Sequence, residues 1–244
     1  MIMNKKRILY QINIEDKKKL YERFLSEHFT NAEILEYTNE LFNFKYWQDA
    51  QEIRKKMRLK YGDSDLAMFT GTLQVLYCII RKFRPSIMVE TGVHFGLSSL
   101  VFTCGLVKNK KGKLISIDNW NNEDCGCYVP KRFDSRWKLI KGRSEDILPK
   151  LKTKKIDIFC HDSDHSYKTQ LFEYEWAIRN IKKDGLIFSH DLGASNAWFD
   201  FTKKYNLEYY LIKTATEDYS TGITKIKTPN HIKKYLDNSK GEWK

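Results

Sequence analysis

The 244-residue sequence lacks most of the features that mark membrane, secreted or disordered proteins. It contains no uninterrupted apolar run near the roughly 20 residues that a membrane-spanning helix needs. The first residues carry charges without an apolar stretch and small residues after it, so we expect no signal peptide. Only four prolines occur in a chain that is 41% hydrophobic and 14% aromatic, enough for a substantial core. We therefore expect a globular, cytoplasmic protein.

Cysteines are also few, and nothing in their number or spacing indicates a disulfide framework. There are five of them, an odd number. We expect reduced thiols, in keeping with a cytoplasmic location. Cys125 and Cys127 form the one close pair, and no second Cys/His pair at zinc-finger spacing accompanies it.

The charge balance is strongly basic, with a formal net charge of +12. Basic proteins bind nucleic acid, anionic lipid or phosphorylated substrates. The lysines are spread along the whole chain rather than gathered in one aromatic-rich patch, so we interpret them as solvated surface. Nucleic acid is therefore not an expected partner.

The pattern of apolar residues changes along the chain. Helical spacing predicts helices over 15–29, 31–62 and 71–83. From there short apolar runs alternate with helical patterns, which predicts an α/β fold with a parallel sheet covered on both faces and an antiparallel closing hairpin. The expected strands are 87–92, 113–119, 137–142, 156–162, 185–191, 208–215 and 222–228. The expected helices between them are 97–109, 144–151, 167–183 and 195–205.

These patterns divide the chain into three parts. We expect an N-terminal helical extension over 1–62, acting as a lid or a dimer contact. The main domain should cover 63–230, and 231–244 reads as a polar tail.

The turn after the first strand of the sheet, "VETGVHFGLSS", carries Gly92 and Gly96. Ligands of open α/β sheets bind at the carboxyl ends of the strands, and glycine lets the backbone approach them closely. The spacing is neither the dinucleotide fingerprint nor a phosphate loop. Ser98, at the start of the next helix, could cap that helix or contact a ligand. A tight strand–helix connection without a ligand is the alternative.

The second strand ends in "SIDNW", which leaves Asp118 at its carboxyl tip. A carboxylate there can accept both hydroxyls of a ribose. The alternative is an acid that caps the following loop. Trp120 could form a shelf for a purine or simply pack.

Five segments then occur in order at predicted strand ends and helix starts: "ETGVHFGLSSL", "LISIDNW", "GRSEDILPKL", "FCHDSDHSY" and "DGLIFSHD". Together they resemble the class I S-adenosylmethionine-dependent methyltransferases. The branch that they resemble most is that of macrocin-type sugar O-methyltransferases and cephalosporin-hydroxylase-like proteins, over roughly 65–228. The resemblance implies a Rossmann-like methyltransferase fold whose seven-stranded, mostly parallel sheet has the order 3-2-1-4-5-7-6.

The resemblance also implies which residues hold S-adenosylmethionine. The glycine turn would line its methionine end, Asp118 would hold the ribose and Ser144 would lie near the adenine. For Ser144, capping of the helix that begins "SEDI" is the alternative. The full cofactor-binding set is Glu90, Gly92, Gly96, Ser98, Asp118, Ser144 and Asp162.

Acids and imidazoles gather after the fourth and fifth strands, whose tips meet in the implied order. Close carboxylates repel unless a proton or a cation lies between them. The resemblance implies a divalent metal at Asp162, His190 and Asp191, for which Mg²⁺ or Mn²⁺ is the candidate. In the alternative, Asp162 fixes the cofactor amine, His190 packs and Asp191 caps. A regular strand would point His190 and Asp191 to opposite faces.

Asp164 and His165 are the candidate catalytic bases for removing a proton from the methyl acceptor. His165 has an ordinary pKa close to neutrality, whereas Asp164 lies where the resembling sugar enzymes place their base. His165 could instead be a helix-start residue bonded to backbone. We expect Glu173 and Glu175, on the helix that follows, to face solvent.

The stretch 121–137 is too long for a bare connection, so we expect it to form a wall for the acceptor; a disordered surface loop is the alternative. The side chains that it offers are Tyr128, Lys131, Arg132, Phe133 and Arg136.

The expected activity is O-methylation of a sugar, a glycan precursor or another small molecule. The acceptor could be a sugar or a phosphorylated metabolite, and the chain could form a homo-oligomer. The alternatives are an RNA methyltransferase, for which the basic charge speaks, and a catalytically inactive partner subunit that binds the cofactor. The absence of an N-P-P-Y block argues against the first, and the complete set of implied cofactor residues argues against the second.

Overall fold

The computed structural model describes residues 24–62, 70–212 and 221–227. The predicted tail 231–244, most of the predicted helix 15–29 and the end of the predicted strand 208–215 lie outside the described residues. Residues 24–28 are helical.

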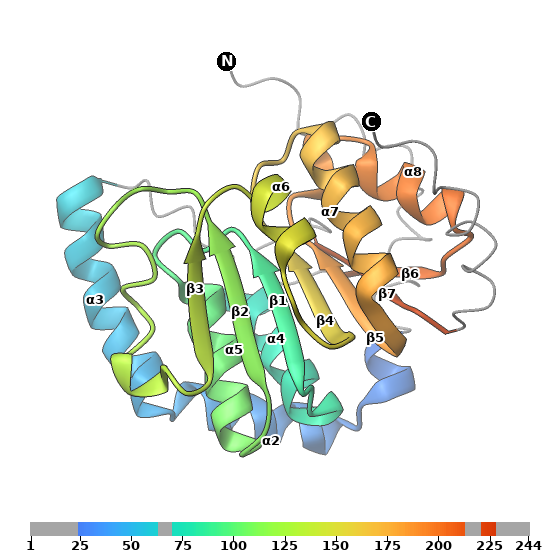
Figure 1. Ribbon diagram of the computed structural model, residues 1–244. Helices are drawn as coiled ribbons and strands as arrows, with labels where there is room; N and C mark the ends of the chain where they lie inside the picture. The colour runs from blue at the N-terminus through green and yellow to red at the C-terminus, as the bar shows by residue number, and fades with distance from the viewer. Residues whose placement is uncertain (1–23, 63–69, 213–220, 228–244) are drawn as a thin grey trace.

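Seven strands form one sheet in the order β3-β2-β1-β4-β5-β7-β6, which is the order that we expected (Figure 1). The first five pair in parallel, and β7 pairs antiparallel with both β5 and β6. The carboxyl ends of the five parallel strands, β1 to β5, therefore lie at the same end of the sheet. The strands are β1 (Ile87–Thr91), β2 (Lys113–Asp118), β3 (Trp137–Lys141), β4 (Ile156–His161), β5 (Ile181–Ser189), β6 (Tyr209–Ile212) and β7 (Thr221–Lys225).

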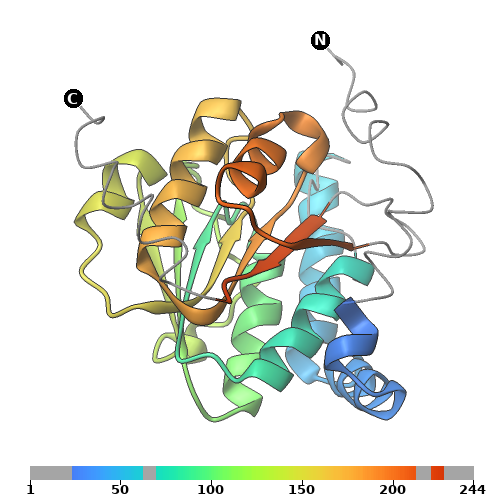
Figure 2. The ribbon, with the colours of Figure 1, turned by 90° about the vertical axis from the view of Figure 1, so that its right-hand side faces the viewer.

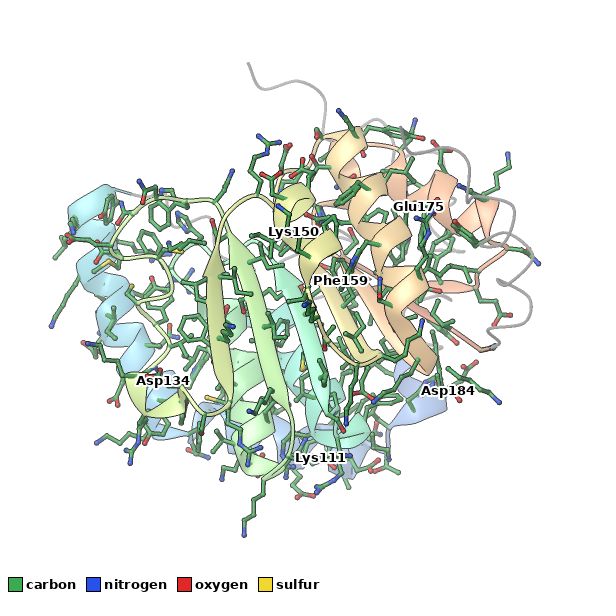
Figure 3. The ribbon with its side chains drawn as sticks, viewed as in Figure 1. Lys111, Asp134, Lys150, Phe159, Glu175 and Asp184 are labelled. Carbon is green, nitrogen blue, oxygen red and sulfur yellow. The ribbon has the colours of Figure 1, made fainter. Side chains whose placement is uncertain are left out.

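Helices cover both faces of the sheet, as Figures 1 and 2 show. One face carries α4 (Thr70–Phe83) and α5 (Leu97–Lys108), with the N-terminal helices outside them. The other carries α6 (Ser144–Ile147), α7 (Tyr167–Asn180) and α8 (Ala197–Lys204). Phe159 of β4, labelled in Figure 3, belongs to the core on this second side and packs against Trp176 of α7. Short 3₁₀ turns lie at Lys131–Phe133, Leu148–Lys150 and Leu192–Ala194.

The single helix predicted over 31–62 is wrong, because the chain breaks into α2 (Asn31–Phe42) and α3 (Lys45–Tyr61). Thr30 starts α2 with a capping box, and Phe44 between the two helices is extended. The break buries both Leu41 and Trp47 in the core that α4 and α5 also form. Tertiary packing, rather than a glycine or proline, ends α2.

Polar contacts hold α2 against α4. The Nε of Arg81 lies 2.5 Å from a carboxylate oxygen of Glu40, and the hydroxyl of Tyr77 donates to the same oxygen. The helices before residue 62 are therefore packed into the same core cluster as the sheet. The domain boundary at residue 62 stays a prediction.

Two further boundaries differ from the prediction. The helix expected over 167–183 ends at Asn180, because Ile181 is extended and pairs with Ile156 of β4. The strand expected over 185–191 ends at Ser189. Among the described helices, none has the length and apolarity to span a bilayer.

Candidate cofactor and acceptor pocket

A cavity of about 900 Å³ lies at the carboxyl ends of β1, β2, β4 and β5. Lys111 and Asp184, labelled in Figure 3, mark the opposite ends of the strands. The volume lies within the range of small-molecule sites. Nearly all the residues predicted for the site line this cavity: Gly92, Gly96, Ser98, Asp118, Ser144, Asp162, Asp164, His165, His190 and Asp191.

The glycine turn between β1 and α5 interlocks with neighbouring backbone. Gly92 and Gly96 have φ angles of +82° and +89°, which side chains rarely adopt. A Cβ atom at Gly92 would lie 1.9 Å from the carbonyl oxygen of Asp162, and one at Gly96 would lie 2.9 Å from the Cα of Gly126. The glycines thus allow two other segments to close on the turn that shapes the cavity.

Glu90 is the predicted cofactor residue that does not line the cavity. Its side chain is fully buried, and its carboxylate accepts hydrogen bonds from Ser98 (2.5 Å), Ser99 and Ser116 (2.7 Å). Burial raises the pKa of Glu90 to about 7, although the three hydroxyls counteract this. Through these bonds Glu90 ties the start of α5 to β2, and its predicted contact with the cofactor stays a prediction.

Asp118 lines the cavity and also organises the loops around it. One carboxylate oxygen accepts the backbone N–H groups of Val93 (2.6 Å) and His94 (2.8 Å), and the other accepts that of Trp120 (2.6 Å). A carboxylate has about four acceptor positions. Asp118 can therefore hold the turn and still accept a ribose hydroxyl.

The loop between β2 and β3 is packed on the glycine turn and is not a disordered surface segment. The backbone N–H of Gly126 donates to the carbonyl of His94 at 2.8 Å, and that of Tyr128 donates to the carbonyl of Phe95 at 3.0 Å. His94 in turn stacks on Trp120, with ring centroids 4.5 Å apart.

Of the five side chains predicted to face the acceptor, Tyr128 lines the cavity. The other four do not, so the prediction is wrong for them. Phe133 is buried against Tyr46, and Arg136 donates to the carbonyl of Gly112 at the far end of β2. The reason is that the loop runs down the edge of the sheet before returning to β3 (Figure 1).

Beyond β4 and β5, four ionisable side chains form imidazole–carboxylate pairs. The Nδ1 of His190 lies 3.1 Å from Oδ1 of Asp162 and 3.8 Å from Oδ1 of Asp191. The Nε2 of His165 lies 3.3 Å from Oδ2 of Asp191. Asp191 has a φ of +50°, so the strand has ended and His190 and Asp191 both line the cavity. The opposite faces expected of a regular strand are therefore not found.

The predicted metal ligands Asp162, His190 and Asp191 are close together but are paired with one another. Within the described ranges, no group of three or more His, Cys, Asp or Glu side chains is arranged to hold a metal ion. Imidazole and carboxylate suit Mn²⁺ as donor types, yet this arrangement does not fit a metal centre. The metal stays a prediction.

The two candidate bases have different surroundings. Burial would raise the pKa of Asp164, but hydrogen bonds from Ser166 and Thr169 at the start of α7 hold it below its ordinary value. For His165, burial lowers the pKa below 6.5, against the attraction of Asp162 and Asp191. His165 is therefore neutral at neutral pH and can accept a proton, whereas Asp164 is occupied in starting a helix.

Glu173 and Glu175, expected to face solvent, are buried. Glu173 accepts the hydroxyl of Ser163 at 2.7 Å and lies 2.6 Å from Nδ1 of His161, which is also fully buried. The His161 ring meets the His165 ring edge-on, with centroids 5.5 Å apart. This buried cluster packs behind the cavity wall.

Sequence reasoning missed several cavity residues, chiefly Arg54 and Arg58 of α3, together with His94 and Arg143. The helical phase of α3 offered a signal, since Arg54 follows the buried Ala50 by one turn. Nothing in the sequence showed against which element that side would pack.

Comparison with known proteins identifies the segment that builds this cavity. Residues 89–192 match the model of a family described as a methyltransferase domain. This segment is a methyltransferase domain. No curated protein matches the chain.

Solved structures share the architecture of the methyltransferase domain at low sequence identity. An O-methyltransferase from Bacillus cereus, in complex with SAH, is 12% identical with a TM-score of 0.63, covering 76% of this chain and 92% of that one. TomG from Streptomyces achromogenes, in complex with SAM, is 12% identical with a TM-score of 0.58, covering 87% and 99%. SAH-bound PaMTH1 from Podospora anserina is 14% identical with a TM-score of 0.55, covering 88% and 96%. The predicted class I methyltransferase fold is confirmed.

Proposed function

We propose that the protein transfers a methyl group from S-adenosylmethionine to a hydroxyl oxygen of a small molecule, with a sugar or glycan precursor as the acceptor class that the sequence suggests. One observation carries the proposal. A single cavity brings together the glycine turn, Asp118 and the pair formed by His165 and Asp191. The similar structures from B. cereus, S. achromogenes and P. anserina contain SAH or SAM.

The cavity residues divide between the parts of the cofactor. Asp118 would accept a ribose hydroxyl, and Ser144 with Trp120 would flank the adenine. Gly92 and Gly96 leave room for the methionine portion, and the carboxylate of Asp162 would accept its ammonium group. Bound there, the cofactor supplies a methyl group on a positively charged sulfur.

The residues after β4 and β5 would prepare the acceptor. As its oxygen forms the new bond to the methyl carbon and the carbon–sulfur bond breaks, the hydroxyl must lose its proton. His165, neutral at neutral pH, would take that proton, and Asp191 would stabilise the resulting imidazolium. For fast transfer, the walls of the cavity would have to hold the methyl group and the acceptor oxygen in line at roughly 3–3.5 Å.

A divalent metal is the second route to an activated acceptor that the sequence suggests. Mg²⁺ or Mn²⁺ at Asp162, His190 and Asp191 would require these side chains to leave their present pairs. The methylation screen below tests metal assistance, because it is run with and without EDTA. Cytoplasmic location and homo-oligomer formation stay predictions as well.

The test is a screen by mass spectrometry. Purified protein and S-adenosylmethionine are incubated with a pool of sugars, sugar phosphates and nucleotide sugars, with and without EDTA. We expect one acceptor class to gain a methyl group as S-adenosylhomocysteine accumulates, and His165→Gln to abolish most of the product. Binding of the cofactor without transfer to any acceptor would contradict the proposal and favour an inactive partner subunit.

A further inference from the structure

Helix α3 contributes two arginines, Arg54 and Arg58, to the lining of the cavity. The two residues are one helical turn apart, so they lie on the same side of the helix. Arg54 is half-buried and Arg58 is exposed. Lys55 and Lys56 between them are exposed and do not line the cavity. Of these four basic residues, the structure therefore turns the two arginines toward the site.

The orientation of α3 is fixed at both ends of the helix. Near its start, Trp47 and Ala50 are buried in the core. At its end, the hydroxyl of Tyr61 donates to Asp124 at 2.7 Å, and the Nζ of Lys60 lies 2.6 Å from the same oxygen. Asp124 belongs to the loop that packs on the glycine turn. These contacts hold α3 in place beside the cavity, so its residues form part of the cavity lining.

The acids Asp118, Asp162 and Asp191 lie at the strand ends, and they have imidazole or backbone N–H partners there. Asp118 accepts three backbone N–H groups, Asp162 faces His190, and Asp191 faces His165. Arg143 pairs with Glu145 at 3.0 Å. The acids at the strand ends are thus paired locally, and Arg54 and Arg58 line the cavity from a different element, α3.

We propose that Arg54 and Arg58 bind a phosphate or diphosphate group of the methyl acceptor, which makes the substrate a phosphorylated small molecule. This inference rests on the proposed function, because it names the acceptor of the same site. Guanidinium groups bind phosphate oxygens in a two-pronged geometry that lysine cannot reproduce. The net charge of +12 would also draw an anionic acceptor toward the protein. The competing ligand for the two arginines is the carboxylate on the methionine portion of the cofactor.

Calorimetry with inorganic pyrophosphate tests the proposal, using protein saturated with S-adenosylhomocysteine at low ionic strength. The variant Arg54→Gln/Arg58→Gln removes the two cavity charges. The variant Lys55→Gln/Lys56→Gln removes the same number of charges from outside the cavity on the same helix. Arg58→Gln alone, at an exposed position, serves if the double variant does not fold. S-adenosylhomocysteine is titrated into each protein as a second measurement.

We expect pyrophosphate to bind the wild type and the lysine variant alike, and the arginine variant at least about tenfold more weakly. Affinity for S-adenosylhomocysteine should stay within about twofold in all three proteins. Equal pyrophosphate affinities, or no binding to the wild type at millimolar concentration, would overturn the proposal. So would a tenfold loss of S-adenosylhomocysteine affinity in the arginine variant, which would assign the arginines to the cofactor. If the wild type ignores S-adenosylhomocysteine, the proposed function fails, and pyrophosphate titrated without it still tests the arginines.

Discussion

Gly92 faces the backbone carbonyl oxygen of Asp162 so closely that a Cβ atom at Gly92 would lie 1.9 Å from it. Gly92→Ala should therefore force β1 and β4 apart at the cavity. The clash adds to the strain of a φ of +82°. We therefore expect Gly92→Ala to lower the free energy of unfolding, measured in urea, by about 3 kcal/mol or more.

Gly62 provides the control for that variant, because its φ is +73° but no atom of the described residues lies within 4 Å of its Cβ position. With a ψ of −164°, Gly62 lies in a backbone region that is almost restricted to glycine, so Gly62→Ala should cost that backbone strain alone, about 1–3 kcal/mol, and less than Gly92→Ala. Equal losses in the two variants would show that the contact with Asp162 is not tight.

The burial of Glu90 predicts a pH dependence of stability. Its pKa is about 7 in the folded protein against an ordinary 4.5, so folding favours the protonated form. Protonated Glu90 therefore stabilises the folded protein fully below about pH 4.5, and this contribution to the free energy of unfolding is lost as the pH rises through 7. The difference between the two pKa values corresponds to roughly 3 kcal/mol.

Glu90→Gln cannot titrate and gives the reference. Urea unfolding of both proteins from pH 4.5 to 7.5 should show the wild type losing stability relative to the variant as the pH rises. A constant difference between the two across this range would mean that Glu90 does not carry a raised pKa.

Asp164 and His165 are neighbours in sequence but should behave differently. With the acceptor found by the screen, His165→Gln should lower kcat by about 10²-fold or more, without a change in cofactor affinity. Asp164→Asn should leave kcat within a few-fold and lower stability, because its carboxylate receives hydrogen bonds at the start of α7. The reverse pattern would make Asp164 the base.

Asp124 should hold the end of α3 against the loop after β2. Asp124→Ala removes the partner of Lys60 and Tyr61, so hydrogen exchange should speed up in the last turns of α3 and in that loop. Glu123→Ala is the matched control, since Glu123 is 3.8 Å from Lys60 and 88% exposed. Unchanged exchange in Asp124→Ala would argue that core packing alone positions the helix.

The sheet could be predicted from the sequence because its strands are apolar runs that end in recognisable glycines and acids. The segments around Gly92 and Asp118 fix the carboxyl ends of β1 and β2, and their order matched a known architecture. The break at Phe44 could not be predicted, because tertiary packing causes it and no glycine or proline marks it.

Within the site, the sequence indicated which residues gather but not how each one is used. Glu90 looked like a ligand-contacting acid, yet three serine hydroxyls enclose it. The contribution of Arg54 and Arg58 depends on how α3 docks, which no local pattern reports. The left-handed backbone at Asp191 is likewise set by the end of β5 and turns both His190 and Asp191 into the cavity.

The most direct test is titration calorimetry of S-adenosylmethionine into the wild type, Asp118→Asn and Asp184→Asn. Asp184 lies at the opposite end of the strands, where it faces Lys225 at 3.6 Å (Figure 3). We predict saturable binding to the wild type and to Asp184→Asn with equal affinity, and binding to Asp118→Asn that is weaker by about tenfold. No binding to the wild type at millimolar concentration, or equal affinity in all three proteins, would contradict a cofactor site at the carboxyl ends of the strands.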